Sequence, residues 1–200
     1  MASLSSHQTN ASTRACSTSS KFSALTEYGV TLAPGLTEAE LGRAEALHGF
    51  HFPPDLRSLL SLALPVGERL PDWRDPESEQ IRKHLAWPLE GIQFDIEHNG
   101  FWWEPWGPRP ADLKEAFEIA RARVEEAPRL IPVYGHRYLP AEPDLPGNPV
   151  FSVYQTDIIL YGVDLRSYLA SEFGATMTSD TVLLEPRRIR FWTDLVESNE

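Results

Sequence analysis

The chain has 200 residues, a length typical of one domain with a tail, and 42% of them are hydrophobic, which is enough for a core. Its net charge of −11 repels phosphate backbones and disfavours nucleic-acid binding. The single cysteine, Cys16, excludes an internal disulfide framework and a cysteine-built zinc site, and no apolar run is long enough to span a bilayer.

The first part of the chain, residues 1–24, is rich in Ser and Thr and contains no acidic residue. Such a segment buries too little apolar surface to fold alone, so we predict a disordered leader followed by one folded domain over residues 25–200. The leader lacks the apolar stretch of a secretory signal. We therefore expect a cytoplasmic protein, although the Ser-rich, acid-free composition also suits a peptide that targets an organelle.

Two helices are predicted after this leader. Thr37 is a good N-cap and Glu40 stands three residues further on, which is the pattern of a capping box, and Gly49 ends the helix. Pro53 and Pro54 suit the start of the second helix, because the first helical turn does not need their missing N–H groups. We expect its buried side to consist of Leu56, Leu59, Leu60 and Ala63.

The middle of the chain gives weaker signals. Residues 65–76 read as a loop with Trp73 as a buried anchor, and Asp75 is placed to cap a short helix over residues 76–85. Residues 92–97 alternate apolar and polar side chains, which favours a strand. Asn99 and Gly100 then predict a turn.

The C-terminal half predicts a helix over residues 111–126, three strands over 130–134, 150–154 and 158–161, and a helix that Asp164 caps and Gly174 ends. Gln155, Thr156 and Asp157 are few enough to join the last two strands as a hairpin. A final helix is predicted over residues 186–196. Helices, then hairpin-linked strands, then helices indicate an α+β fold, a mainly antiparallel sheet packed with helices.

Two segments carry a resemblance to a known family. The first runs from Leu36-Thr37-Glu38-Ala39-Glu40-Leu41 to Gly49-Phe50-His51-Phe52-Pro53-Pro54, and the second is the pair of short strands followed by the helix that begins at Asp164. Over about residues 25–173 the chain resembles the SUKH superfamily, which includes bacterial toxin-immunity proteins and a fungal cell-wall-assembly regulator. It departs from the usual pattern after Leu60 and resembles a divergent member. The resemblance implies an α+β domain that binds proteins and lacks catalysis.

The most unusual local feature is a tryptophan-rich segment flanked by Gly and Pro, which predicts a loop. Aromatic side chains dominate interface hot spots, so we name it as a candidate partner-binding segment: Trp102, Trp103, Glu104 and Trp106. Adjacent residues of an extended chain point to opposite sides, so Trp102 and Trp103 should not enter the same core. We expect at least one of the three tryptophans to be buried and at least one to be partly exposed beside Glu104.

Other polar and aromatic side chains cluster near predicted strands. Two carboxylates and an imidazole, Asp95, Glu97 and His98, would lie on or beside one strand, with both carboxylates on one face. His136 and Arg137 follow another strand, and Tyr154, Gln155 and Asp157 mark the hairpin tip. These residues complete the candidate partner-binding set, although each is also explained by structural hydrogen bonding or turn chemistry.

The sequence therefore favours a non-catalytic, protein-binding domain, an immunity protein that neutralises a basic, nuclease-type toxin, with no cofactor and no metal. An acidic domain attracts a basic protein surface. One alternative is a regulatory scaffold linked to cell-wall or signalling pathways, with the leader carrying phosphorylation sites or short binding motifs. A second alternative is a carbohydrate-active enzyme that uses Asp95, Glu97, His98 and His136 in a pocket walled by Trp102 and Trp103.

Overall fold

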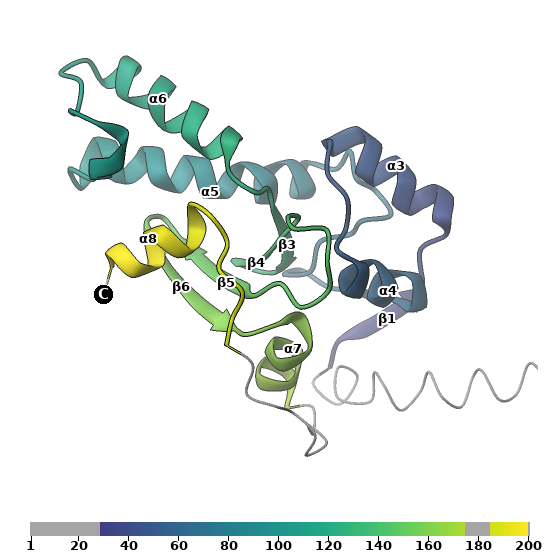
Figure 1. Cartoon of the computed structure of the whole chain (residues 1–200). Helices are drawn as coiled ribbons and strands as arrows, with labels where there is room; N and C mark the ends of the chain where they lie inside the picture. The colour runs from purple at the N-terminus through teal and green to yellow at the C-terminus, as the bar shows by residue number, and fades with distance from the viewer. Residues whose placement is uncertain (1–28, 175–184, 200) are drawn as a thin grey trace, which may run out of the picture.

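The computed structural model describes residues 29–174 and 185–199. The predicted leader lies outside this range. The described chain has an α+β fold, as the sequence predicted, with a two-stranded and a four-stranded antiparallel sheet (Figure 1). None of its helices is long and apolar enough to cross a membrane.

The small sheet pairs β1 (Thr31–Pro34) with β2 (Ala63–Val66). Neither strand was predicted, and β2 takes up Ala63 and the first two residues of the predicted loop over 65–76. Between the two strands lie α3 (Glu38–His48) and α4 (Pro54–Leu62). The predicted caps of α3 are confirmed, because Thr37 and Glu40 form the capping box and Gly49 adopts a positive φ of 68°. Trp73 is buried, as expected.

The longest helix, α5 (Glu79–His98), overturns two predictions. The predicted short helix capped by Asp75 begins instead after Ser78 and does not stop near Leu85, and the predicted strand over residues 92–97 is helical. Pro88 favours a helix end near this point, because a proline leaves the carbonyl four residues earlier without its helical hydrogen-bond donor. Here that carbonyl belongs to His84, and it accepts a hydrogen bond of 2.9 Å from the buried Tyr138 hydroxyl. A side chain of the sheet thus supplies the hydrogen-bond donor that the helix lacks at the His84 carbonyl.

The remaining elements follow the sequence more closely. They are the single 3₁₀ turn η1 (Glu104–Trp106), α6 (Leu113–Glu126), β3 (Leu130–Tyr134), β4 (Arg137–Pro140), β5 (Val150–Tyr154), β6 (Asp157–Gly162), α7 (Leu165–Phe173) and α8 (Trp192–Ser198). The strand β4 was not predicted. The predicted final helix over residues 186–196 was wrong at its start, because residues before Trp192 are not helical. The strands pair in the order β3-β4-β5-β6, so β3 and β6 are the edges of this sheet.

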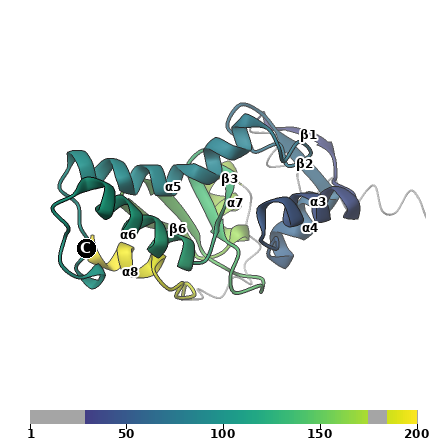
Figure 2. The same cartoon turned by 90° about the horizontal axis from the view of Figure 1, so that it is seen from above.

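Helices cover both faces of the four-stranded sheet, with one buried core on each. In β5, Val150 belongs to the first core and Phe151 and Val153 to the second, as the alternation of a strand requires. The first core includes buried residues of α3, α4 and α7, and the second includes those of the later part of α5, of α6 and of α8. Figure 2 shows α3 and α4 together at one end of the molecule, α6 and α8 at the other, and α5 running from the α6 end toward β1 and β2.

Candidate functional site

The β5–β6 turn is held against one side of α5. Trp87 donates its indole N–H to the Val153 carbonyl at 3.0 Å. One turn further along α5, Gly91 leaves so little room that a Cβ there would lie 2.8 Å from the Cα of Gln155. A further turn on, Asp95 accepts hydrogen bonds from the Thr156 backbone N–H at 2.8 Å and from its hydroxyl at 2.5 Å. Spacing of four residues places these three contacts on one helix face.

Asp95 is a structural carboxylate. Only 4% of it is exposed, and it also accepts a hydrogen bond from the Asn99 side chain at 2.5 Å. Glu97 lies on the exposed side of α5 and pairs with His98 at 3.6 Å. The expectation that Asp95 and Glu97 share one face is therefore wrong, because two residues apart on a helix point in different directions. No group of three His, Cys, Asp or Glu that could hold a metal occurs within residues 29–174 and 185–199.

A surface of aromatic and apolar side chains starts at this turn and continues along β6, and we call it the hairpin surface: Trp87, His136, Tyr154, Ile159 and Tyr161. The Tyr154 ring lies 6.1 Å from the Trp87 ring and 6.3 Å from the His136 ring. Tyr154 pairs with Asp157 and Ser152 with Ile159, so Tyr154 and Ile159 are diagonal neighbours on one face of the sheet, and Tyr161 continues that face. Exposed fractions are 40% for Trp87, 54% for Tyr154, 46% for Ile159 and 39% for Tyr161.

Arg137 packs against the Tyr161 ring of this surface. Its guanidinium lies 3.8 Å from the centre of the Tyr161 ring and donates to the Ser152 hydroxyl at 2.9 Å. Its Nε lies 3.9 Å from a carboxylate oxygen of Glu172 in α7, so the two charges attract each other without a hydrogen bond. Burial, and then the charges of Arg137 and Arg69, lower the pKa of His136 below its usual value. His136 is therefore mainly neutral at pH 7.

The other residues predicted at the hairpin tip play different parts. Gln155 adopts a positive φ of 56°, as one residue of a tight two-residue turn does. Asp157, predicted as the third residue of the connection, is instead the first residue of β6, where it pairs with Tyr154 and is exposed. The structure thus brings Asp95, His136, Arg137, Tyr154, Gln155 and Asp157 to one end of the sheet, while Glu97 and His98 face solvent on α5.

The tryptophan segment forms a separate cluster. Trp106 is 7% exposed, and Trp102 and Trp103 pack against it with ring centroids 5.2 and 5.9 Å away. One tryptophan is buried and two are half-buried beside exposed Glu104, as predicted. The expectation that Trp102 and Trp103 avoid the same core is wrong, because both flank the second core. They reach it because η1 turns the chain so that Trp106 lies between them.

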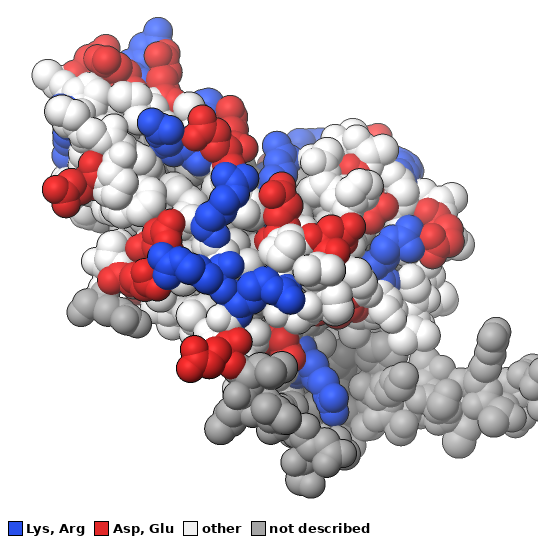
Figure 3. All heavy atoms as spheres, viewed as in Figure 1, with Lys and Arg blue, Asp and Glu red and all other residues white. Residues whose placement is uncertain are grey.

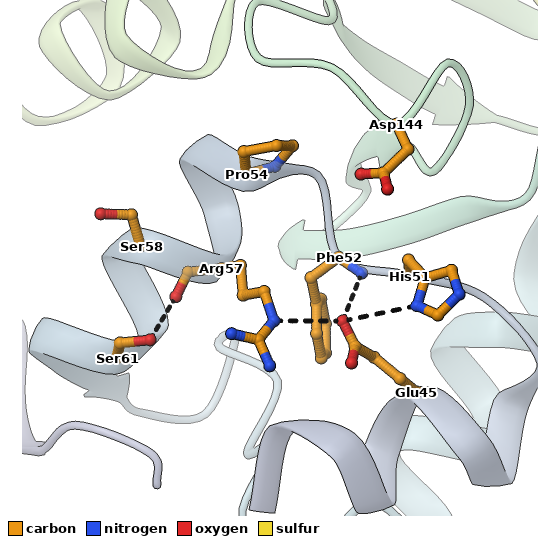
Figure 4. A pocket seen from close by; sticks show the side chains of 8 residues that line it. All are labelled: Glu45, His51, Phe52, Pro54, Arg57, Ser58, Ser61 and Asp144. Carbon is orange, nitrogen blue, oxygen red and sulfur yellow. Dashed lines mark hydrogen bonds and ion pairs between the residues drawn. The ribbon is translucent and has the colours of Figure 1, made fainter. Parts of the chain in front are cut away.

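A third candidate is a hollow of about 520 Å³ between the α3–α4 pair and the loop that follows β4 (Figure 4). Glu45 points into it, and its carboxylate accepts from the Phe52 backbone N–H at 3.0 Å and lies 3.4 Å from Arg57 Nε. Arg57 is also held by Glu38 at 2.8 Å, while Asp144 faces the hollow from the opposite wall. Arg57 of α4 is held by two carboxylates of α3, so we interpret this network as one that joins α3 to α4.

Sequence reasoning missed Trp87 and the outward side chains of β6. The predicted helix ended at Leu85, so Trp87 lay outside it and could not be assigned to a helix face. Ile159 and Tyr161 carried a usable signal, because they alternate with Ile158 and Leu160 along one strand. The spacing did not reveal which of the two pairs faces solvent.

Comparisons with protein-family models, with curated proteins and with solved structures found no significant match for this chain.

Proposed function

We propose that this protein is a non-catalytic binding domain that docks a protein partner through the hairpin surface. The observation that carries the proposal is the line of four exposed large side chains that starts at the β5–β6 turn and continues along β6: Trp87, Tyr154, Ile159 and Tyr161. Soluble proteins seldom expose contiguous apolar side chains without a use for them, and tyrosine and tryptophan are enriched among interface hot spots. Asp95 and Gly91 fix the turn, which lowers the entropy lost on binding.

The partner class follows from charge and from the resemblance. The net charge of −11 favours encounter with a basic protein, and the resemblance to SUKH immunity proteins favours a basic, nuclease-type toxin in the cytoplasm. Acidic side chains are spread over the face drawn in Figure 3, with basic ones among them. Long-range attraction would come from the sum of these charges, and close contact from the aromatic side chains.

The test uses a basic toxin encoded beside the gene for this protein, co-expressed and purified with the full chain. Tyr154→Ala and Ile159→Ala should each weaken the complex by about 2 kcal/mol, roughly 30-fold, without lowering the unfolding midpoint. Leu145→Ala is the matched control, since Leu145 is 51% exposed on the loop after β4, away from the hairpin. Equal affinities for all three variants would reject the hairpin surface.

Salt dependence tests the role of charge separately. Electrostatic steering predicts an association rate that falls as ionic strength rises, with a smaller effect on dissociation. An association rate that stays constant between low and high salt would show that the acidic character does not select the partner. A complex with several unrelated proteins and no toxin would favour the regulatory scaffold instead.

A further inference from the structure

A second pocket, of about 230 Å³, opens between the tryptophan segment and the start of α8. It takes no part in the hairpin surface. Its apolar walls are the rings of Trp103, Trp106 and Phe191, with Trp103 5.4 Å from Phe191 and Trp106 stacked 6.4 Å from Phe191 at an interplanar angle of 11°. Arg123 of α6 and Arg190 stand at the rim. The volume suits a group of the size of one ring.

One wall of this pocket, the Phe191 ring, belongs to a residue with a strained backbone conformation. Phe191 has φ 69° and ψ −58°, which is a γ-turn of the rare kind, closed by the Trp192 N–H donating to the Arg190 carbonyl at 2.9 Å. A bulky residue in this region is strained by about 1–3 kcal/mol, and such residues cluster at ligand-binding and active sites. In this backbone conformation the Phe191 ring lies beside the rings of Trp103 and Trp106.

The hydrogen-bond donors and acceptors of the pocket differ in how many partners they have. Among the acceptors, Asp194 takes hydrogen bonds from the Phe191 backbone N–H at 2.9 Å and from Arg188, and Glu126 takes one from Arg123 at 3.2 Å. Among the donors, Arg190 has, within residues 29–174 and 185–199, only a contact of 3.9 Å with Glu142, and both side chains are about two-thirds exposed. The Trp106 indole N–H is buried, and no residue of the described chain accepts from it.

Arg123 and Arg190 therefore keep unused donors, and of the two carboxylates at the pocket Asp194 is the one that already takes two hydrogen bonds. A guanidinium offers five N–H donors, and Arg123 and Arg190 each use a small part of theirs. Their natural complement is a carboxylate, which an arginine binds through two parallel hydrogen bonds. Figure 3 shows Lys and Arg side chains gathered over the segment that leads into α8, on a chain that is acidic as a whole.

We propose that this pocket binds a carboxylate attached to a ring-sized apolar group, with the ring packed against Trp103 and the carboxylate at Arg190 and Arg123. The same chemistry occurs in a free aromatic acid and at the C-terminus of a peptide that ends in an aromatic residue. The site is independent of the protein-binding function assigned to the hairpin surface.

The test titrates the full-length, ¹⁵N-labelled protein with 3-phenylpropionate, following its tryptophan indole N–H signals and the heat of binding. The alcohol 3-phenylpropanol and the amine 3-phenylpropylamine present the same ring with no charge and with the opposite charge. The acid should bind about tenfold more tightly than the alcohol, and the amine more weakly still, because a charge-assisted hydrogen bond is lost or replaced by repulsion. Equal affinity for acid and alcohol, or no signal change at millimolar acid, would overturn the proposal.

Variants locate the site. Arg190→Gln should weaken acid binding about tenfold and leave the alcohol unchanged, because it removes only the charge. Trp103→Ala should weaken both ligands. Arg43→Gln, which removes an exposed arginine of α3, and Phe94→Ala, which removes an exposed ring of α5, are matched controls that should change neither. Since Arg190 is exposed, its variant remains informative even if Trp103→Ala unfolds.

The source of the carboxylate is settled by a pair of peptides, Gly-Gly-Phe with a free C-terminus and the same peptide amidated. Binding of the free peptide, equal to or tighter than that of 3-phenylpropionate and lost on amidation, assigns the pocket to peptide C-termini. Binding of the acid without the free peptide assigns it to small carboxylic acids. Both results support the site, whereas binding that ignores amidation contradicts it.

Discussion

The hydroxyl of Tyr138 takes the place of a missing backbone donor. Pro88 has no N–H, so the His84 carbonyl would be an unsatisfied acceptor in the middle of α5 if Tyr138 did not reach it at 2.9 Å. The ring of Tyr138 is fully buried, and burial raises the pKa of its hydroxyl well above the usual value. The hydroxyl therefore stays protonated and remains a donor throughout the physiological pH range.

We expect Tyr138→Phe to lower the free energy of unfolding by about 1–3 kcal/mol, since it leaves the His84 carbonyl without a partner. In a Pro88→Ala background the helix supplies its own N–H, so the same change should be nearly neutral. Urea denaturation of the four proteins of this double-mutant cycle measures the coupling. An equal loss in both backgrounds would show that Tyr138 contributes only packing.

The carboxylate of Asp95 is the residue-scale feature on which the hairpin surface depends. Asp95→Ala should lower the free energy of unfolding by roughly 2–4 kcal/mol, because it leaves the Thr156 donors and the Asn99 amide without their acceptor. Glu97→Ala, on the exposed side of the same helix, should change it by less than about 0.5 kcal/mol. Comparable losses would contradict the structural role assigned to Asp95.

His84 gives the fold a dependence on pH. Burial lowers its pKa below the ordinary 6.5, so the folded protein holds it neutral while the unfolded chain takes up a proton. The unfolded state then binds more protons, and stability must fall as the pH drops below about 6.5. Urea midpoints at pH about 7.5 and 5.5 should differ less in His84→Gln than in the unchanged protein. An identical difference would assign the effect to other groups.

At the scale of elements, the packing of α5 on the β5–β6 turn decides where the hairpin surface lies. Trp87, Gly91 and Asp95 meet the turn in succession, and Gly91 is the point of closest approach. Glycine is normally a weak residue inside a helix. Glycine is needed at position 91 because a Cβ there would collide with the Gln155 backbone.

A matched pair of glycine substitutions tests this packing. In an open helical position, Gly→Ala stabilises by about 0.5–1 kcal/mol. Gly42→Ala in α3 should show that gain, because no atom lies within 4 Å of the new Cβ. Gly91→Ala should instead destabilise by about 1–3 kcal/mol, since its Cβ would meet the Gln155 backbone. A gain at both positions would mean that α5 does not press on the turn.

At the scale of the whole molecule, the four-stranded sheet lies between two cores that share its strands. Leu41 and Ile92 are fully buried, one in each core. Because neighbouring residues of one strand enter opposite cores, loss of one core removes the support of the other. The two cores should therefore unfold together as a single domain.

We expect Leu41→Ala and Ile92→Ala each to lower the free energy of unfolding by about 2–5 kcal/mol, with one cooperative transition in both variants. Tryptophan fluorescence and far-UV circular dichroism should give coincident curves, because Trp73 lies in the first core and Trp192 in the second. Two separate transitions would show that the cores are independent.

The sequence by itself determined the features that are satisfied within a few residues. The caps at Thr37 and Asp164 and the ends of helices at Gly49 and Gly174 all follow from local hydrogen bonds and allowed φ values. The α+β fold class followed from the order of these elements.

Only the tertiary structure decided the rest, because the missing information lay in distant partners. The helical course of α5 past Pro88 needs the Tyr138 hydroxyl, which is 54 residues from its acceptor His84, and the alternating pattern of residues 92–97 is helical because Ile92 and Ile96, one turn apart, reach the second core. Candidate residues were identifiable as chemical types, but their grouping was not. Asp95 meets Thr156 and Trp103 meets Phe191 only after the chain has folded.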